Sequence, residues 1–251
     1  MRRISGVLFL VALLTGALVV PGPALAGSAP SARASNAVVE TRVIGTSVEG
    51  RPIRAFRLGN PASPVKVVLI ATMHGNEFQP ARILANLRDH RRIHRADIWV
   101  IPFLNPDGYV HRTRRNAHGV DLNRNFPVSW IPQGGSYNSG PAPASEPETQ
   151  AVMAFLSEVR PRYVVSFHQP LHGIDNSYAK TRTLARRLSR NLDLPRKRFT
   201  CNNGCHGTLT QWFNHTLPGA AITVEYGPHM SRRQRFVTGP RGLLRTFHAT
   251  R

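Results

Sequence analysis

The stretch that decides the fold lies at residues 65–77 and has the sequence VKVVLIATMHGNE. Apart from Lys66, its first eight residues are apolar or β-branched. Such a run is typical of a strand buried on both faces. Strands of this kind lie at the centre of the sheet in α/β proteins. The run stops at Thr72, and a helix is expected over 77–92.

Strands and helices continue to alternate on both sides of this stretch. A hairpin is expected before it, with strands at 38–44 and 51–58 around a turn at 47–50. After it, the pattern predicts strands at 97–103, 163–167 and 220–226, and helices at 145–159, 178–192 and 231–246. Ser145 and Glu148 have capping-box spacing at the start of the first of these helices. This order, without any repeat, predicts a three-layer α/β/α sandwich with a mixed, mostly parallel central sheet.

The first 26 residues have the features of a signal peptide. Two arginines precede an apolar run at 7–20, and Ala24-Leu25-Ala26 is a small-residue cleavage site. The apolar run is shorter than the ~20 residues that a spanning helix needs, so we expect removal rather than a retained anchor. No transmembrane segment is expected in the mature chain. Residues 27–36, rich in Ala, Ser and Pro, are expected to be a disordered lead-in to one domain over 37–251.

The composition describes a strongly cationic globular chain. In 251 residues, 33 Lys and Arg stand against 13 Asp and Glu, a net charge of +20, and 41% of the residues are hydrophobic, which excludes disorder. Loss of Arg2 and Arg3 with the signal peptide leaves 31 basic and 13 acidic residues, a net charge of +18. The arginines are spread along the chain, which argues against a nucleic-acid-binding arm, and we expect no specific nucleic-acid partner.

Three arginine-rich segments, 88–95, 182–198 and 232–245, fall mostly on expected helices. Apolar residues lie between the arginines, so these segments are either ordinary solvated helix faces or surfaces for electrostatic contact with anionic cell-wall polymers or membranes. The expected oligomeric state is a monomer.

Cys201 and Cys205 are the two cysteines of the chain. They lie four residues apart in a Gly- and Asn-containing segment, and an exported chain meets an oxidising environment, so we expect a disulfide that closes a small loop. Two free thiols are the alternative. A zinc site built from cysteines is not expected, because no second pair exists.

Polar side chains follow three of the expected strands. His74 and Glu77 follow the strand at 65–72, His168 follows the strand at 163–167, and Glu225 lies near the end of the strand at 220–226. Ligand sites in α/β folds lie beyond the carboxyl ends of strands, and two His with one Glu and an open position is the pattern of catalytic zinc. A bare His-x-x-Glu also occurs by chance, so the spacing alone leaves metal binding open.

The segment between the two halves of this possible site is long and rich in Arg and Asn. Over 108–144 it shows no periodicity, and loops of that length in compact domains are usually functional. Arg114 and the pair Asn123-Arg124 lie in it. Guanidinium groups present paired donors in a fixed geometry, so this loop suits the binding of a carboxylate.

Taken together, these motifs resemble the zinc metallocarboxypeptidases. The motifs that match, in family order, are His74-x-x-Glu77, Arg114-x-Asn116, Asn123-Arg124, His168 and Thr223-Val224-Glu225. Through three further segments, 139–149, 166–170 and 207–212, the chain is most similar to the bacterial murein peptide amidase branch. The resemblance covers nearly all of the mature chain and implies that 37–251 is a single zinc carboxypeptidase-like catalytic domain.

The resemblance also implies a role for each matching residue. One Zn²⁺ ion would be held by His74, Glu77 and His168. Glu225 would act as general base on the zinc-bound water, whose pKa the metal lowers toward ~7, and Arg114 would stabilise the oxyanion. Asn123 and Arg124 would bind the terminal carboxylate of the substrate. Asp121 would orient the first zinc histidine. A structural carboxylate is the alternative for Glu225, and an ordinary loop acid for Asp121.

The expected substrate pocket departs from that of the pancreatic carboxypeptidases. No tyrosine occurs between Tyr178 and Tyr226, where that type carries a mobile tyrosine that grips substrate, so we expect the disulfide-closed loop to replace it. The pocket segment 208–211, which contains the candidate substrate-binding residue Thr210, has neither an acid nor a large apolar lining. A polar pocket near arginines favours a polar or anionic residue.

These features favour a secreted or wall-associated hydrolase. The expected reaction is cleavage of the γ-D-glutamyl-diaminopimelate bond in peptidoglycan peptides, which carry several carboxylates. Two alternatives are a general zinc carboxypeptidase acting on ordinary peptides and a non-catalytic cationic wall-binding protein. A deacylase of N-acyl amino acids is a third, against which the export signal and the intact Asn123-Arg124 pair argue.

Overall fold

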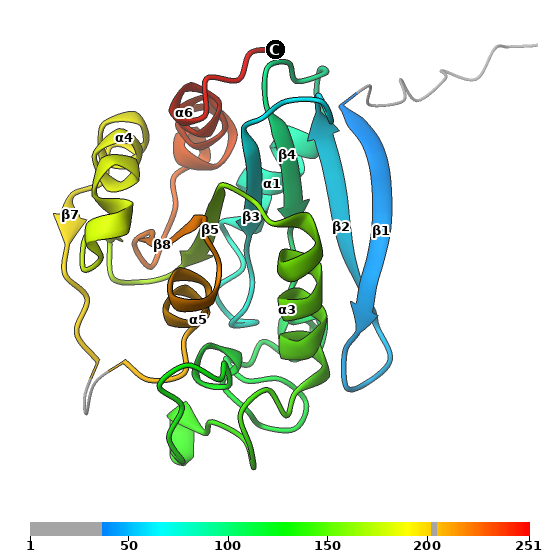
Figure 1. The fold of residues 1–251 in the computed structure, drawn as a ribbon, viewed down its shortest axis with the longest axis vertical. Helices are drawn as coiled ribbons and strands as arrows, with labels where there is room; N and C mark the ends of the chain where they lie inside the picture. Colours follow the sequence, from blue (N-terminus) through cyan, green and yellow to red (C-terminus); the bar gives the residue numbers. More distant parts are fainter. Residues whose placement is uncertain (1–36, 202–204) are drawn as a thin grey trace, which may run out of the picture. The chain divides into compact units, whose positions relative to one another are not determined.

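The computed structural model describes residues 37–201 and 205–251, so the expected signal peptide and lead-in lie outside the described residues. Within this part of the chain, eight strands form one sheet in the order β1-β2-β4-β3-β5-β8-β6-β7 (Figure 1). The strands are β1 (Val38–Thr46), β2 (Pro52–Gly59), β3 (Lys66–Ile70), β4 (Asp97–Ile101), β5 (Tyr163–His168), β6 (Gly173–Asp175), β7 (Arg196–Lys197) and β8 (Ala220–Glu225).

The sheet is mixed, with a parallel centre. β3 pairs in parallel with β4 and with β5, and β5 pairs in parallel with β8. β1 and β2 form the expected antiparallel hairpin, β2 is antiparallel to β4, and β6 is antiparallel to β8. The predicted fold class is therefore confirmed. Because β3, β5 and β8 run in the same direction, their carboxyl ends meet at one edge of the sheet.

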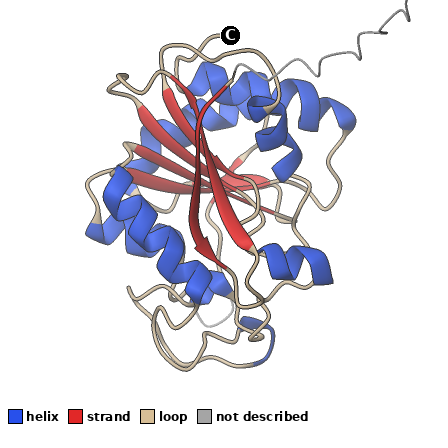
Figure 2. Cartoon of the chain, turned by 90° about the vertical axis from the view of Figure 1, so that its right-hand side faces the viewer, coloured by secondary structure: helices blue, strands red, loops and turns tan. Residues whose placement is uncertain are grey.

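Helices pack on both faces of this sheet (Figure 2). On one face lie α1 (Ala81–Arg88), α4 (Arg182–Leu192) and α6 (Gly239–Thr246), and on the other α3 (Pro147–Val159) and α5 (Leu209–Thr216). The central strand β3 supplies both cores by alternation: Val67 and Leu69 join the first, and Val68 and Ile70 join the second. All four side chains are fully buried, which explains the uninterrupted apolar run in the sequence.

Two expected helix starts are wrong. α1 begins at Ala81 rather than at 77, because Pro80 occupies its N-cap position and the preceding residues form turns. The capping box at α3 is absent: the hydroxyl of Ser145 donates to the Glu146 carboxylate (2.7 Å), and Glu148 accepts from buried groups elsewhere. α3 instead begins with a proline in its first turn, where the missing N–H costs no hydrogen bond.

Several short elements lie where the sequence predicted only loop. α2 (Pro106–His111) is capped by Asn105, whose side chain accepts a hydrogen bond from the Gly108 N–H (2.8 Å). α5 begins with a capping box formed by Thr208 and Gln211. The others are β6, β7, η1 (Leu122–Arg124) and η2 (Gly135–Tyr137). Within the helices expected over 178–192 and 231–246, the first turns are instead η3 (Ala179–Thr181), which leads into α4, and the π-helical η4 (Gln234–Thr238), which leads into α6.

The arginine-rich helix α4 shows how the chain carries its charge. Leu184, Leu188 and Leu192 are buried against the sheet, while Arg186 and Arg190 are exposed. Among the described residues, no helix has the length and apolar character needed to cross a bilayer.

Candidate metal centre

The parallel strands bring the chemically active residues to one edge of the sheet. In the register of β5 and β8, His168 lies directly opposite Glu225. His74 and Glu77 follow β3 on a turn that passes close to α2. A Cβ atom added at Gly75 would lie 1.9 Å from the carbonyl carbon of Gly108, so this turn requires glycine.

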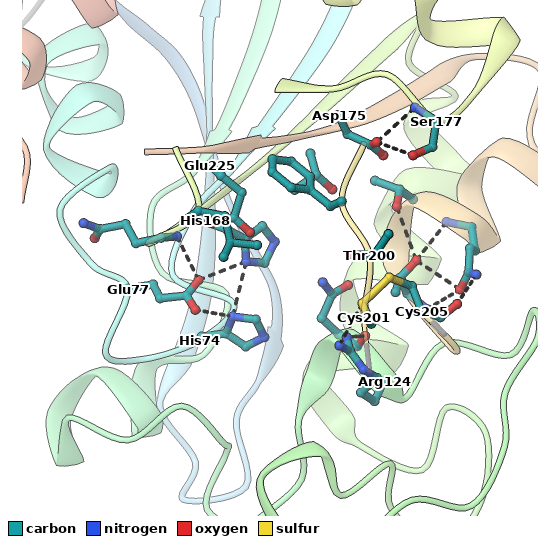
Figure 3. Close-up of a pocket in the computed structure, with 18 of the residues that line it drawn as sticks. His74, Glu77, Arg124, His168, Asp175, Ser177, Thr200, Cys201, Cys205 and Glu225 are labelled. Atoms are coloured by element: carbon teal, nitrogen blue, oxygen red, sulfur yellow. Dashed lines mark hydrogen bonds and ion pairs between the residues drawn. A yellow bond between two sulfur atoms is a disulfide. The ribbon is translucent and has the colours of Figure 1, made fainter. Parts of the chain in front are cut away.

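Three of these side chains converge on one point (Figure 3). The Nδ1 atom of His74 lies 2.8 Å from Oε1 of Glu77, and the Nδ1 atom of His168 lies 3.0 Å from Oε2 of the same carboxylate. The two Nδ1 atoms are 3.2 Å apart. One potential ligand atom from each residue lies within 4.8 Å of the other two, and all three residues are buried.

The outer nitrogen of each imidazole has its own partner. Nε2 of His74 lies 3.0 Å from Oδ1 of Asp121, and Nε2 of His168 lies 2.9 Å from the hydroxyl of Ser166. When Nε2 carries the proton and donates it to such an oxygen, Nδ1 presents its lone pair to the cluster. Both rings are therefore oriented as metal ligands.

Strong electrostatic coupling holds the cluster together. Burial would lower the pKa of His74, but the carboxylates of Glu77 and Asp121 outweigh burial and raise it to about 9. Burial acts to raise the pKa values of both carboxyl groups, yet the adjacent histidines hold the pKa of Glu77 well below its usual range, and His74 does the same for Asp121. These groups are therefore poised to hold a positive charge between them.

The chemistry of the donor set fits zinc. Two imidazole nitrogens and one carboxylate oxygen are a common set of protein ligands for catalytic Zn²⁺, which keeps a further position open. Two Nδ1 atoms that face each other across 3.2 Å compete for one proton, whereas one cation would satisfy both nitrogens and the carboxylate together. The hydrogen bonds from Asp121 and Ser166 supply the outer support that such ligands usually have.

Arg114 connects this cluster to the long loop. Its Nε and Nη2 atoms donate to Oδ2 of Asp121 (3.0 and 2.9 Å), and its Nη1 donates to Oε1 of Glu77 (3.1 Å). Burial acts to lower the pKa of Arg114, but these two carboxylates raise it above its usual value. The guanidinium is thus fixed in place with one end directed at the cluster.

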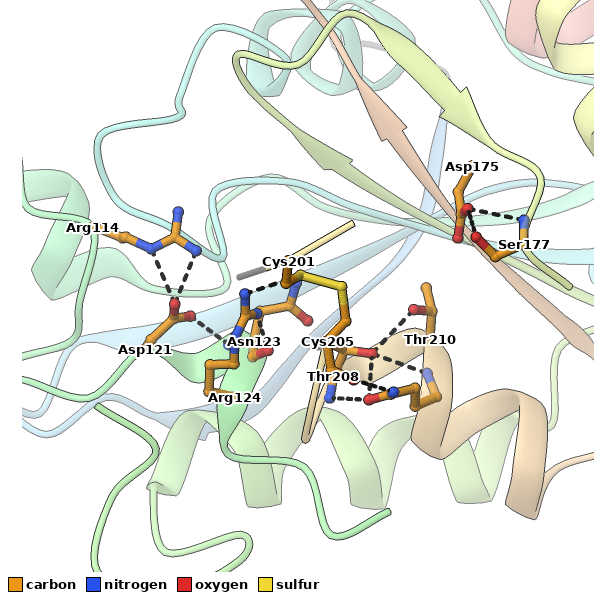
Figure 4. The surroundings of a disulfide bond; sticks show 11 residues. Arg114, Asp121, Asn123, Arg124, Asp175, Ser177, Cys201, Cys205, Thr208 and Thr210 are labelled. Carbon is orange, nitrogen blue, oxygen red and sulfur yellow. Dashed lines mark hydrogen bonds and ion pairs between the residues drawn. A yellow bond between two sulfur atoms is a disulfide. The ribbon is translucent and has the colours of Figure 1, made fainter. Parts of the chain in front are cut away.

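The pair Asn123-Arg124 lies on the 3₁₀ turn η1, which Asp121 caps through the N–H of Asn123 (3.0 Å). The side-chain oxygen of Asn123 accepts from the N–H of Leu209 (3.1 Å), which fixes the side-chain amide. Arg124 donates to the carbonyl of Asn123 (2.7 Å), and its Nη2 lies 3.5 Å from the sulfur of Cys201 (Figure 4). A disulfide joins Cys201 to Cys205, as expected.

Glu225 is buried close to the cluster. Its Oε2 accepts from the N–H of Leu171 (3.3 Å), and burial raises its pKa above the usual value. A carboxylate with a raised pKa and a single backbone donor is suited to take up a proton.

One cavity of about 570 Å³ connects all of these groups. Ten of the residues singled out in the sequence line it, namely His74, Glu77, Arg114, Asn123, Arg124, His168, Cys201, Cys205, Thr210 and Glu225. Asp121 lies behind the lining and holds His74 and Arg114 from there. The structure thus gathers every predicted site residue in one place.

Sequence reasoning missed four further residues that line the cavity: Tyr137, Asp175, Tyr178 and Arg198. The ring of Tyr137 lies 5.5 Å from the guanidinium carbon of Arg114 and 5.0 Å from that of Arg124. Tyr178 forms a side-chain hydrogen bond with Thr210, and burial, followed by the charge of Asp175, raises its pKa. No periodic pattern marks these positions, but Asp175 is one of few acids in a basic chain.

Comparison with known proteins places this geometry in context. Residues 31–204 match the zinc carboxypeptidase family. Murein peptide amidase A of Vibrio campbellii is 32% identical over 202 residues, which cover 73% of this chain and 78% of the relative. The crystal structure of the murein-tripeptide amidase MpaA from Escherichia coli O157 superposes with a TM-score of 0.68 at 28% identity, covering 86% of this chain and 96% of that one.

Other relatives match over a smaller part of their length. Bovine carboxypeptidase O is 35% identical over 153 residues, 47% of this chain and 41% of the relative. Murein peptide amidase A of Escherichia coli K12 is 34% identical over 158 residues, 54% of this chain and 62% of the relative. The chain therefore spans about two fifths to three fifths of the length of these two proteins.

Asp121→Asn tests the support of the metal cluster. We expect zinc affinity to fall by about 10- to 100-fold, because the His74 ring and Arg114 lose their charged acceptor. Titration with a competing chelator measures the affinity, and Asp89→Asn, which changes an exposed carboxylate paired with Arg88, is the matched control. Equal zinc affinities in the two variants would contradict this account of Asp121.

Proposed function

The chain belongs to the zinc carboxypeptidase family, and from this membership we propose that it is a zinc-dependent hydrolase of peptide or amide bonds next to a terminal carboxylate. The observation that carries the proposal is the shared cavity. It joins a metal-ligand cluster, a buried carboxylate and a pair of arginines that could bind an anion. In this proposal His74, Glu77 and His168 hold one Zn²⁺ ion, which when bound lowers the pKa of a water molecule and polarises the scissile carbonyl.

The buried carboxylate of Glu225 supplies the proton transfer. Its Oε2 is held by the N–H of Leu171, which leaves Oε1 for the reacting groups. Burial raises the pKa of Glu225, so the carboxylate can accept a proton from the attacking water and later donate it to the leaving amine. In that sequence a C–O bond forms, the C–N bond breaks, and the proton passes from water to nitrogen through one side chain.

Arg114 and Arg124 bind two different negative charges of the substrate. Arg114 is held by Asp121 through Nε and Nη2. Its Nη1 donates one hydrogen to Glu77, and the second would be donated to the oxyanion that develops on the carbonyl. Arg124 and the amide of Asn123 bind the terminal carboxylate, with the guanidinium fixed by the Asn123 carbonyl. Separate cations for these two anions place the scissile bond at a set distance from the chain end.

The substrate that this site favours is a peptidoglycan stem peptide. Murein peptide amidases are among the relatives along most of this chain, and charged side chains, among them Arg114, Arg124 and Asp175, line the pocket. We propose that the bond hydrolysed is γ-D-glutamyl-diaminopimelate. A general carboxypeptidase acting on ordinary peptides, as the match to carboxypeptidase O suggests, is the alternative outcome of the test.

We further propose that the mature protein works outside the cytoplasm, in contact with anionic wall polymers. The composition of residues 1–26, the net positive charge and the disulfide support this location. When the full chain is expressed in a bacterial host, we expect to find the protein in the medium or the wall fraction, with a mass that corresponds to a chain starting near Gly27. We also expect protein bound to isolated walls to dissociate as the salt concentration rises. Recovery in the cytoplasm with Met1 intact would contradict this proposal.

The reaction is tested with zinc-loaded protein and two isomeric tripeptides. One is L-alanyl-γ-D-glutamyl-meso-diaminopimelate, and the other carries an ordinary α-linked L-glutamate. We expect mass spectrometry to show metal-dependent release of diaminopimelate from the γ-linked peptide. Cleavage of only the α-linked peptide would identify a general carboxypeptidase, and cleavage of neither would contradict the proposed function.

Glu225→Gln is the matched inactive variant for this assay. We expect kcat to fall by about 10²- to 10⁴-fold, because the amide cannot accept the proton, while the zinc content stays at one ion per chain. Glu158→Gln, whose carboxylate is largely exposed, is the control. A Glu225→Gln protein that keeps wild-type kcat would remove Glu225 from the mechanism.

A further inference from the structure

Asp175 places a carboxylate inside the cavity on the same face of the sheet as Glu225. In the antiparallel register of β6 and β8, Gly173 lies opposite Glu225 and Ile174 opposite Val224. Side chains alternate along a strand, so Asp175 shares the face of Gly173 and hence of Glu225, about 7 Å further along the strand. Figure 3 shows Asp175 with Ser177 across the cavity from His74 and Glu77.

This carboxylate is buried without a cation. Its exposed fraction is 7%, and its Oδ1 accepts from the N–H (3.0 Å) and the hydroxyl (2.6 Å) of Ser177. None of the ion pairs formed among the described residues includes Asp175. Lys197 is opposite it in the register with β7, but its Nζ atom donates to the carbonyl of Leu171 instead.

A buried carboxylate usually has a cationic partner, because the charge is costly to remove from water. The wall of the cavity supplies two hydrogen bonds to Oδ1, and within residues 37–201 and 205–251 no cationic side chain pairs with Oδ2. The missing positive charge is therefore one that a ligand would bring. An ammonium group on the side chain of the residue bound beside Arg124 has this chemistry.

A cation lies close to this acid but on the exposed side. Arg198 directly follows β7, in which Lys197 pairs with Asp175, and it lines the same cavity with an exposed side chain. The distal end of the cavity thus offers one buried carboxylate and one guanidinium. A side chain that ends in both an ammonium and a carboxylate would complement the two together.

We propose that Asp175 is a specificity-determining residue that binds the side-chain ammonium of the residue released, and that Arg198 binds the carboxylate beside that ammonium. The substrate class is then peptides whose last residue is a diamino dicarboxylic acid. This inference rests on the proposed function of the cavity, and it adds an acid to a pocket in which the sequence indicated none. The test must therefore separate a failure of recognition from a failure of hydrolysis.

Three γ-D-glutamyl peptides that differ only in their last residue make this separation. Diaminopimelate carries both distal groups, lysine carries only the ammonium, and 2-aminopimelate carries only the carboxylate. We expect Asp175→Asn, which keeps an oxygen to accept from Ser177, to lower kcat/KM by ~10-fold or more for the first two and by less than ~2-fold for the third. Arg198→Gln is expected to lower kcat/KM for the diaminopimelate and 2-aminopimelate peptides but not for the lysine peptide.

Asp193→Asn, an exposed carboxylate at the end of α4, is the control for all three substrates. An equal loss on all three substrates in Asp175→Asn would show a structural role and overturn the proposal, as would no loss at all. If the wild-type enzyme cleaves none of the peptides, the proposed function fails. Recognition is then measured by calorimetry with the free amino acids and zinc-loaded Glu225→Gln.

In that binding measurement, tighter binding of diaminopimelate than of 2-aminopimelate by ~10-fold or more, abolished by Asp175→Asn, would support the role of Asp175. Equal affinities for the two amino acids would contradict it, whatever the outcome of the hydrolysis assay.

Discussion

The site depends on the hydrogen bonds that the carboxylate of Asp121 accepts. Its Oδ1 fixes the His74 ring and caps the turn η1, and its Oδ2 holds two nitrogens of Arg114. One buried side chain thus sets the orientation of the His74 ring, the direction of the Arg114 guanidinium and the position of Asn123-Arg124. The pKa of Asp121 stays far below its usual range because cationic groups surround it, so the carboxylate keeps its charge at every physiological pH.

The sheet supplies the second constraint, since it decides which residues can meet. β3, β5 and β8 end at one edge, and the loop residues reach that edge through Asp121. The result is a cavity with distinct regions: metal ligands with Glu225, the arginines of the long loop, and the Asp175 wall on β6. A substrate with charges at matching places would be oriented by all three regions.

Residues at the ends of the central strands and in the loop motif were predictable from the sequence, whereas residues in short elements outside these motifs were not. The apolar run before His74 located the central strand, and the motif around Arg114 and Asn123 indicated the anion-binding loop. Asp175 was not predicted from the sequence because β6 has three residues, too few to show the alternation of a strand. The position of Asp175 also depends on the pairing of β6 with the distant β8. The expected start of α3 was wrong because Ser145 accepts from Asn125 and Glu148 accepts from Asn116, instead of each capping the backbone of the other. Local spacing does not reveal such tertiary partners.

The proposed zinc site requires that His74, Glu77 and His168 together hold a single ion. X-ray absorption at the zinc edge of the loaded protein tests it most directly. We expect one zinc per chain, with two imidazole nitrogens at about 2.0–2.1 Å, additional oxygen ligands and no sulfur, and we expect this signal to be lost in the double variant His74→Gln/His168→Gln. A sulfur ligand, or an unchanged spectrum in the double variant, would contradict it.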